Sequence, residues 1–181
     1  VQHPSRQMSR QEFLAWVDQQ PERYELVAGH VVHMARERAI HNDVKYLAWT
    51  ALRRAIAEAG VPCHVKGDGI AVEARDDAWY LPDATVHCGQ PIAPEATVVK
   101  EPVIIVEVTS PSTGTLDGSS KLIDYFSIPS VQHYLIISPG QRVVAHHRRL
   151  EDMNLSTRLI GTGPIVLDPP GITIRVDELF P

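Results

Sequence analysis

The chain has 181 residues, of which 44% are hydrophobic and 22% charged, so it can bury a sizeable core, as an ordinary globular domain does. No apolar run approaches the length of a membrane span, and the N-terminal residues lack the basic-then-apolar pattern of a signal peptide. The formal net charge of -5 argues against a protein that coats nucleic acid by positive charge alone.

The N-terminal third predicts a helix, a hairpin and a long helix. Residues 8–19 predict a helix in which Ser9 is a suitable N-cap, and Pro21 ends it. Strands at 24–27 and 31–34 flank a turn around Gly29. Apolar residues then recur at three- and four-residue steps over 37–59, which predicts a helix packed on a sheet.

The remaining chain predicts short strands and one further helix. Strands are expected at 63–65, 70–73, 80–87, 103–108, 131–137, 142–147, 155–160, 165–167 and 172–174, and a helix at 116–128. This mixed order predicts an α/β or α+β fold with a central mixed sheet flanked by helices. We expect one domain over 1–181, with an N-terminal helix and hairpin (8–35), a core (37–150) and a β-rich C-terminal tail (151–181).

The two cysteines, Cys63 and Cys88, predict neither a disulfide framework nor a zinc ligand pair. A reducing, cytoplasmic setting is therefore expected for a chain of this composition. The Ser-Pro-Ser-Thr loop at 110–113 lacks the elbow of a serine hydrolase, and we find no phosphate-binding loop with a Lys-Ser/Thr pair.

Glu107 is the first candidate functional residue. It lies inside the strand 103–108, where five of six residues are β-branched and apolar, which indicates burial on both faces of a sheet. A carboxylate in that position must be protonated, paired or bound to a metal. The simplest alternative is a structural glutamate that meets an arginine or lysine.

Asp83 is the second candidate, at a Pro-Asp step that enters a strand. Strands that are successive in the chain usually pair or lie near each other, so Asp83 and Glu107 are expected on neighbouring strands. Two such carboxylates can converge on a hard cation such as Mg²⁺, with the carbonyl of Val108 as a third ligand.

Lys121 is the third candidate, because Asp117, Lys121 and Tyr125 (or Asp124) recur at helical spacing in the segment 116–128. One interpretation is a solvated helix face with one ion pair. The other is a lysine that points back over the strand end, where it stabilises a phosphorane-like transition state or orients a water molecule. The spacing alone does not separate them.

Several motifs in order resemble the Uma-type family of bacterial restriction-endonuclease-like proteins. The resemblance covers roughly residues 8–150. The matching segments are Arg23 to Gly29, His41, Tyr80-Leu81-Pro82-Asp83, Pro102 to Thr113, Asp117…Lys121…Tyr125 and Val131…Tyr134-Leu135-Ile136.

This family is similar to the PD-(D/E)XK nucleases, in which an Asp and a Glu bind Mg²⁺ and a Lys activates water. The resemblance therefore implies that Asp83 and Glu107 bind the metal and that Glu25 is an additional acid near the site. Thr109 occupies the position of the superfamily's usual lysine, so the resemblance implies that Lys121 replaces it from the helix.

Histidines offer weaker candidates. His41 begins the long helix, one position off its apolar stripe, and either reaches the cleft or remains a surface residue. His146 and His147 are adjacent in a strand, so their side chains point to opposite faces and cannot easily share a cation. An edge strand with a basic exit is the favoured interpretation of that segment, with a contact to a phosphate backbone as the alternative.

The sequence supports two hypotheses for the function. The first is a Mg²⁺-dependent endonuclease acting on DNA, with Mn²⁺ as a substitute and a homodimer as the expected assembly; bound cations would offset the acidic net charge. The second is an inactive nuclease fold that serves as a dimeric binding or regulatory module, favoured by the net charge and by Thr109. A carboxylate pair for glycoside cleavage would need an open sugar groove that no feature of the sequence predicts.

Overall fold

The structure, a computed structural model, describes residues 7–34, 36–109, 117–151 and 154–181. Its centre is a mixed six-stranded sheet in the order β10-β9-β8-β7-β6-β3, beside a four-stranded sheet β2-β1-β5-β4 and a hairpin β11-β12. The strands of the central sheet are β3 (Cys63–Gly67), β6 (Ala84–Cys88), β7 (Pro102–Val108), β8 (His133–Ser138), β9 (Val143–Arg149) and β10 (Leu155–Ile160). The others are β1 (Tyr24–Val27), β2 (His30–His33), β4 (Val72–Arg75), β5 (Ala78–Tyr80), β11 (Pro164–Leu167) and β12 (Ile172–Arg175).

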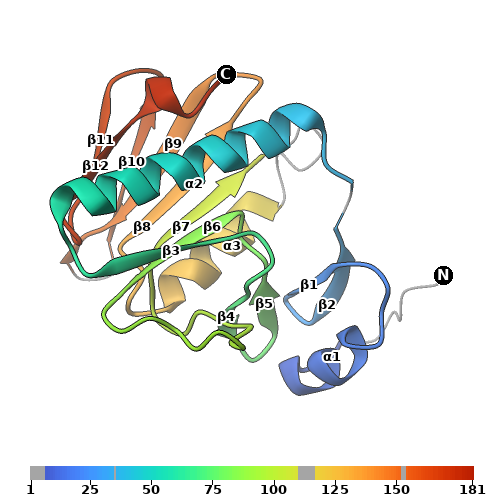
Figure 1. Ribbon diagram of the computed structural model, residues 1–181. Helices are drawn as coiled ribbons and strands as arrows, with labels where there is room; N and C mark the ends of the chain where they lie inside the picture. Colours follow the sequence, from blue (N-terminus) through green and yellow to red (C-terminus); the bar gives the residue numbers. More distant parts are fainter. Residues whose placement is uncertain (1–6, 35, 110–116, 152–153) are drawn as a thin grey trace.

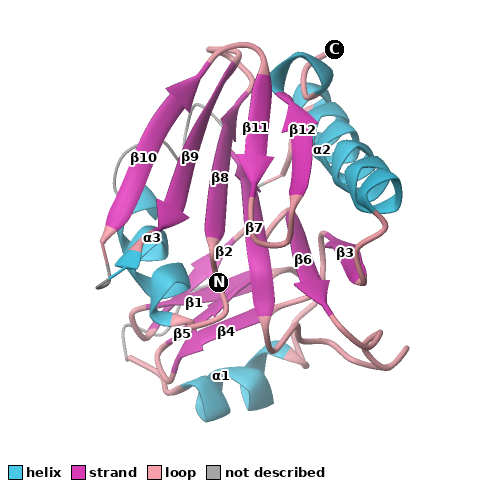
Figure 2. Ribbon diagram, turned by 90° about the vertical axis from the view of Figure 1, so that its left-hand side faces the viewer, coloured by secondary structure: helices cyan, strands magenta, loops and turns pink. Residues whose placement is uncertain are grey.

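Helices lie on both sides of the central sheet (Figures 1 and 2). The helices of the protein are α1 (Arg10–Val17), which packs on the four-stranded sheet, α2 (Ala39–Ala59), α3 (Asp117–Ser127) and a short 3-10 helix, η2 (Val176–Glu178). Val106 belongs to a hydrophobic core that contains buried residues of α2 and of the β11–β12 hairpin. Ile105, the neighbouring residue of β7, belongs to a second hydrophobic core, which contains buried residues of α3. This alternation confirms the mixed sheet flanked by helices. No helix in the described ranges is long and apolar enough to cross a membrane.

Local signals in the sequence located several helix ends and turns correctly. Ser9 and Glu12 form a capping box at the start of α1, and Gly60 ends α2 in the left-handed conformation. β1 and β2 pair as the expected hairpin. The long helix begins at Ala39, two residues later than expected, which leaves Glu37 in the extended segment before it.

Strand β7 occupies the middle of the central sheet, as its composition predicts. It pairs antiparallel with β6 and parallel with β8. Ile104, Ile105 and Val106 are fully buried, which confirms a strand covered on both faces. The pairing of Ala84 with Val106 confirms that the strands after Asp83 and around Glu107 are neighbours.

The expectation of one strand over 80–87 is wrong. The chain forms β5 in the small sheet, leaves it at Leu81, and starts β6 in the central sheet at Ala84. Pro82 has no N–H to donate to a ladder, so the break falls where a continuous strand would lose a bond. The segments expected at 63–65 and 70–73 are likewise divided between the two sheets, as β3 and β4.

The expectation for the cysteines is also wrong, because Cys63 and Cys88 form a disulfide. The antiparallel pairing of β3 with β6 places the two residues directly opposite each other, with their Cα atoms 3.9 Å apart. They are separated by 25 residues in the chain, so only the strand pairing brings them together.

Strand β9 is not the edge strand that was expected, since β10 pairs along its outer side. His146 and His147 do point to opposite faces. The His147 ring lies 2.8 Å from Thr157 Oγ1, whereas His146 is buried, with its Nε2 2.9 Å from His133 Nδ1. His133 Nε2 in turn lies 2.9 Å from the carbonyl oxygen of Pro169. The Pro169 carbonyl can only accept, so His133 carries a proton on Nε2, and in the neutral form of His133 its Nδ1 accepts from the Nε2–H of His146.

This buried histidine pair predicts a loss of stability in acid. Burial lowers the pKa of both His133 and His146 to about 4, from an ordinary value of 6.5. The unfolded chain therefore binds protons first as the pH falls, so the stability contributed by the neutral pair is complete above about pH 6.5 and decreases towards pH 4. We expect the free energy of unfolding to fall by about 1 kcal/mol for each histidine, and so by about 2 kcal/mol for the pair, between roughly pH 7 and pH 5.7.

Urea unfolding at a series of pH values measures this loss. The double variant His133→Gln/His146→Gln should show a flatter pH dependence, whereas His30→Gln, at an exposed position, should behave as the parent does. An unchanged pH dependence in the double variant would assign the acid sensitivity to other groups.

Candidate active site

Four elements deliver the four residues that the sequence singled out. Glu107 lies near the end of β7, Asp83 precedes the first residue of β6, Glu25 is on β1 and Lys121 is in α3. The connection from β5 to β6 passes beside β1, where the amide of Leu81 donates to Glu25 Oε1 at 2.9 Å, and Lys121 contacts both Glu25 of the small sheet and Glu107 of the central sheet. All four residues therefore gather at one end of β6 and β7.

Lys121 points into this site rather than towards solvent. Its side chain is only 10% exposed, and its Nζ lies 3.1 Å from Glu107 Oε1 and 3.0 Å from Glu25 Oε2. The interpretation of this α3 face as solvated is therefore wrong. Tyr125, one turn later on the same face, donates its hydroxyl to Glu107 Oε1 at 2.6 Å. Asp124 faces elsewhere and pairs with Arg75 and the Tyr80 hydroxyl, and the side chain of Asp117 lies outside the described residues.

The surroundings of Glu107 favour its protonated form more than water does. Burial raises the pKa of Glu107, Lys121 counteracts this, and the negative charges of Glu25 and Asp83 raise it further. Burial and the negative charges of Glu107 and Glu25 raise the pKa of Tyr125, which keeps its hydroxyl a donor. A positive charge brought to this end of the sheet would therefore favour the ionised carboxylates.

Asp83 is held by groups on both sides. Its Oδ2 accepts from the amide of Val108 at 2.6 Å, and its Oδ1 lies 2.7 Å from Lys45 Nζ. His41 Nε2 lies 3.7 Å from Oδ2, so the structure places His41 beside Asp83. The contact from Val108 comes through its N–H, and a ligand role for the Val108 carbonyl stays a prediction.

Lys45 and Glu37 are parts of this site that the sequence analysis missed. Lys45 Nζ contacts the carboxylates of Asp83, Glu37 and Asp68, and Arg23 pairs with Asp68 in turn. Burial alone would lower the pKa of Lys45, but these carboxylates outweigh it and raise the pKa. The signal was present in the sequence, because Lys45 interrupts an apolar stripe and lies one turn after His41.

The donor set fits a divalent cation. Glu37, His41 and Asp83 each offer one ligand atom, and these three atoms lie within 4.8 Å of one another. Two carboxylate oxygens and one imidazole nitrogen suit Mn²⁺ and related transition metals, and the carboxylates also suit Mg²⁺. Asp83 belongs both to this group and to the expected pair with Glu107.

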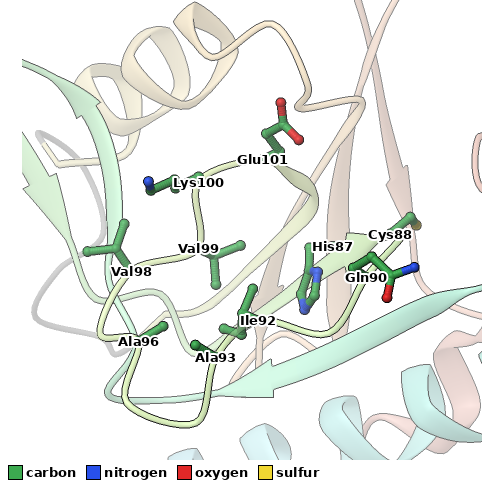
Figure 3. Close-up of a pocket in the computed structure, with 10 residues that line it drawn as sticks. All are labelled: His87, Cys88, Gln90, Ile92, Ala93, Ala96, Val98, Val99, Lys100 and Glu101. Carbon is green, nitrogen blue, oxygen red and sulfur yellow. The ribbon is translucent and has the colours of Figure 1, made fainter.

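A separate hollow of about 450 Å³ lies at the other end of β6 and β7. Its lining includes His87, Ile92, Ala93 and Val99, and Figure 3 shows the His87 ring directed towards the loop that carries Ile92 and Ala93. His87 Nε2 is buried without a hydrogen-bond partner among the described residues, and burial, with His64 and Lys66, lowers the pKa of His87. This hollow does not contain the acidic residues described above.

A mixed sheet with helices on both faces, two carboxylates on a paired β6–β7 unit and a lysine beside them is typical of restriction-endonuclease-like proteins. The model of the Uma2 family, described as "Putative restriction endonuclease", matches residues 10–176. The chain therefore belongs to the Uma2 family.

Two uncharacterized proteins of Synechocystis sp. are similar to the chain. One is 23% identical over 179 residues, covering 98% of this chain and 93% of the relative, and the other is 27% identical over 153 residues, covering 83% and 86%. A crystal structure from Anabaena variabilis, described as "a putative nuclease belonging to DUF820", shares the fold with a TM-score of 0.76 at 14% identity, covering 96% of this chain and 97% of that one.

Proposed function

We propose that the protein is a Mg²⁺-dependent endonuclease that hydrolyses phosphodiester bonds of DNA, with Mn²⁺ as a possible substitute. The observation that carries this proposal is the position of Lys121, whose Nζ lies 3.1 Å from Glu107 Oε1 and 3.0 Å from Glu25 Oε2. A lysine from α3 thereby contacts the carboxylate of Glu107. Thr109, in the position of the usual strand lysine, instead directs its hydroxyl to Ser138 Oγ on β8 at 3.1 Å.

Each residue has a role in this proposal. Asp83 and Glu107 would hold the cation, with the Val108 carbonyl as a further ligand, and the amide of Val108 fixes the Asp83 carboxylate at 2.6 Å. When bound, the cation would polarise a phosphoryl oxygen and stabilise the charge of the transition state. Lys121 orients the attacking water and donates to the developing negative charge. Glu25 positions Lys121 and accepts from the amide of Leu81, in the connection between β5 and β6.

The first test compares substrates and metals. We expect the purified protein to nick supercoiled plasmid with Mg²⁺ or Mn²⁺ and to be inactive in a chelator. Asp83→Asn should lose this activity, because it removes one negative charge from the metal site while keeping the size of the side chain. Single-stranded DNA and RNA, tested in parallel, show whether duplex DNA is the preferred substrate.

Failure of all substrates with both metals would favour the second candidate, a nuclease fold retained as a dimeric binding or regulatory module. Its specific support is Thr109 in the usual position of the strand lysine, together with the net charge of -5. We propose a homodimer and a cytoplasmic setting for either function. Sedimentation equilibrium tests whether the protein is a homodimer. Trapping of free thiols in cells tests whether the Cys63–Cys88 bond forms in the cytoplasm.

A further inference from the structure

Lys45 is a buried cation placed on the carboxylate of Asp83. Its side chain is 8% exposed, and its Nζ lies 2.7 Å from Asp83 Oδ1 and 2.8 Å from Asp68 Oδ2, with Glu37 as the third partner. A lysine loses most of its hydration in such a position, so it needs the surrounding carboxylates to remain charged. The roles proposed for Asp83, Glu107 and Lys121 make no use of this second lysine.

The contacts of Lys45 coincide with the candidate metal ligands. Two of the three residues whose donor atoms converge, Glu37 and Asp83, are bound by the Lys45 ammonium. The third, His41, lies four residues before Lys45 on α2, so both side chains approach Asp83 from the same helix face. The Lys45 ammonium and a divalent cation bound to Glu37 and Asp83 would repel each other and compete for these carboxylates.

The balance of charges around Lys45 also allows a divalent cation to take its place. Three carboxylates, from Glu37, Asp68 and Asp83, are paired with two cations, Lys45 and Arg23. With Lys45 withdrawn, the group keeps an excess of two negative charges, which equals the charge of one divalent cation. Arg23 contacts Asp68 through two nitrogens and does not touch Asp83 or Glu37 in any contact described, so it can stay in place.

We propose that Lys45 is an internal competitor for the divalent cation: it neutralises Asp83 and Glu37 in the metal-free protein and is displaced when a cation binds to Glu37, His41 and Asp83. This inference rests on the proposed function in taking Asp83 as a metal ligand. The imidazole of His41 makes the site bind Mn²⁺ more tightly than Mg²⁺, which prefers oxygen ligands and keeps its water.

Calorimetric titration of the full chain with Mn²⁺ and with Mg²⁺ tests the proposal. Lys45→Met removes the competing charge and keeps an unbranched apolar stem, so we expect it to bind Mn²⁺ at least about tenfold more tightly than the parent. Lys45→Arg keeps the charge and should bind as weakly as the parent. Lys100→Met, at an exposed lysine, is the matched control and should leave the affinity unchanged.

A second measurement covers the stability of the variant, because Lys45→Met leaves three carboxylates close together. In a chelator its Tm should be lower than that of the parent, and saturating Mn²⁺ should raise its Tm by more than it raises that of the parent. A variant that folds only when Mn²⁺ is added supports the proposal equally, since the metal then replaces the lost ammonium. His41→Ala should reduce the preference for Mn²⁺ over Mg²⁺.

Two results overturn the inference in different ways. Equal or weaker Mn²⁺ binding by Lys45→Met, together with loss of binding in Asp83→Asn, overturns the role of Lys45 and leaves the metal site of the proposed function intact. Absence of binding to both the parent and Lys45→Met at millimolar metal overturns the inference together with the proposed metal dependence.

Discussion

Replacement of Lys121 by methionine is expected to lower the rate of DNA cleavage by about 10²- to 10⁴-fold, the usual contribution of a group that transfers or positions a proton. The reason is geometric, since Lys121 is the cation in contact with both Glu107 and Glu25, at 3.1 and 3.0 Å. Single-turnover cleavage of a labelled duplex at saturating metal measures the effect on the chemical step.

The loss must be separated from unfolding, because Lys121→Met leaves the buried carboxylates of Glu25 and Glu107 without the cation that they share. Breaking a buried pair in this way costs about 3–5 kcal/mol. Circular dichroism in the assay buffer gives the folded fraction, and the double variant Glu25→Gln/Lys121→Met should recover part of the stability and none of the activity. Lys100→Met serves as the control. A folded Lys121→Met protein that cleaves at the parental rate would remove Lys121 from the mechanism.

The second large effect is on stability. Conversion of Cys63 and Cys88 to alanine is expected to lower the free energy of unfolding by about 3 kcal/mol, because the bond closes a loop between residues 25 positions apart and limits the unfolded chain. The bond joins β3, the edge strand of the central sheet, to β6, which begins next to Asp83. Loss of the bond should therefore destabilise the pairing of β3 with β6 at the edge of the sheet more than the pairing of β7 with β8 at its centre.

Urea unfolding of the oxidised parent, the reduced parent and the double alanine variant measures this contribution. The reduced parent and the variant should unfold at the same lower urea concentration. Hydrogen exchange should rise at β3 amides and change less at β7. Equal midpoints for the oxidised and reduced parent would show that the bond adds nothing to stability.

Part of the candidate site was predictable from the chain alone. A glutamate embedded in the apolar run of β7 needs a partner in any fold, and successive strands commonly pair, so Asp83 and Glu107 follow from general physical arguments. Glu25 and the role of Lys121 came from the family resemblance, because helical spacing leaves open whether a lysine faces solvent or the core. The spacing of Lys121 and Tyr125 did predict correctly that both share one face of α3.

Lys45 and Glu37 were not found in this way. Their contacts depend on how α2 crosses the sheet and on the extended segment before it, and neither is encoded in the periodicity of the helix. The apolar stripe of α2 predicts which face is buried and says nothing of the carboxylates that a lysine on its margin will meet. The local clues are the interruption of the apolar stripe by Lys45 and the four-residue step from His41 to Lys45.

Local physics alone determined much of the secondary structure of this protein. The Ser9 capping box, the left-handed Gly60 and the β-branched run of β7 each depend on residues within a few positions, so the sequence by itself located these elements. The tertiary structure decided the division of 80–87 between two sheets, the Cys63–Cys88 bond, the outer position of β10 and the pairing of Lys45 with Asp83. Each of these joins residues far apart in the chain, and such contacts are set by the packing of the sheets and helices rather than by the preferences of neighbouring residues.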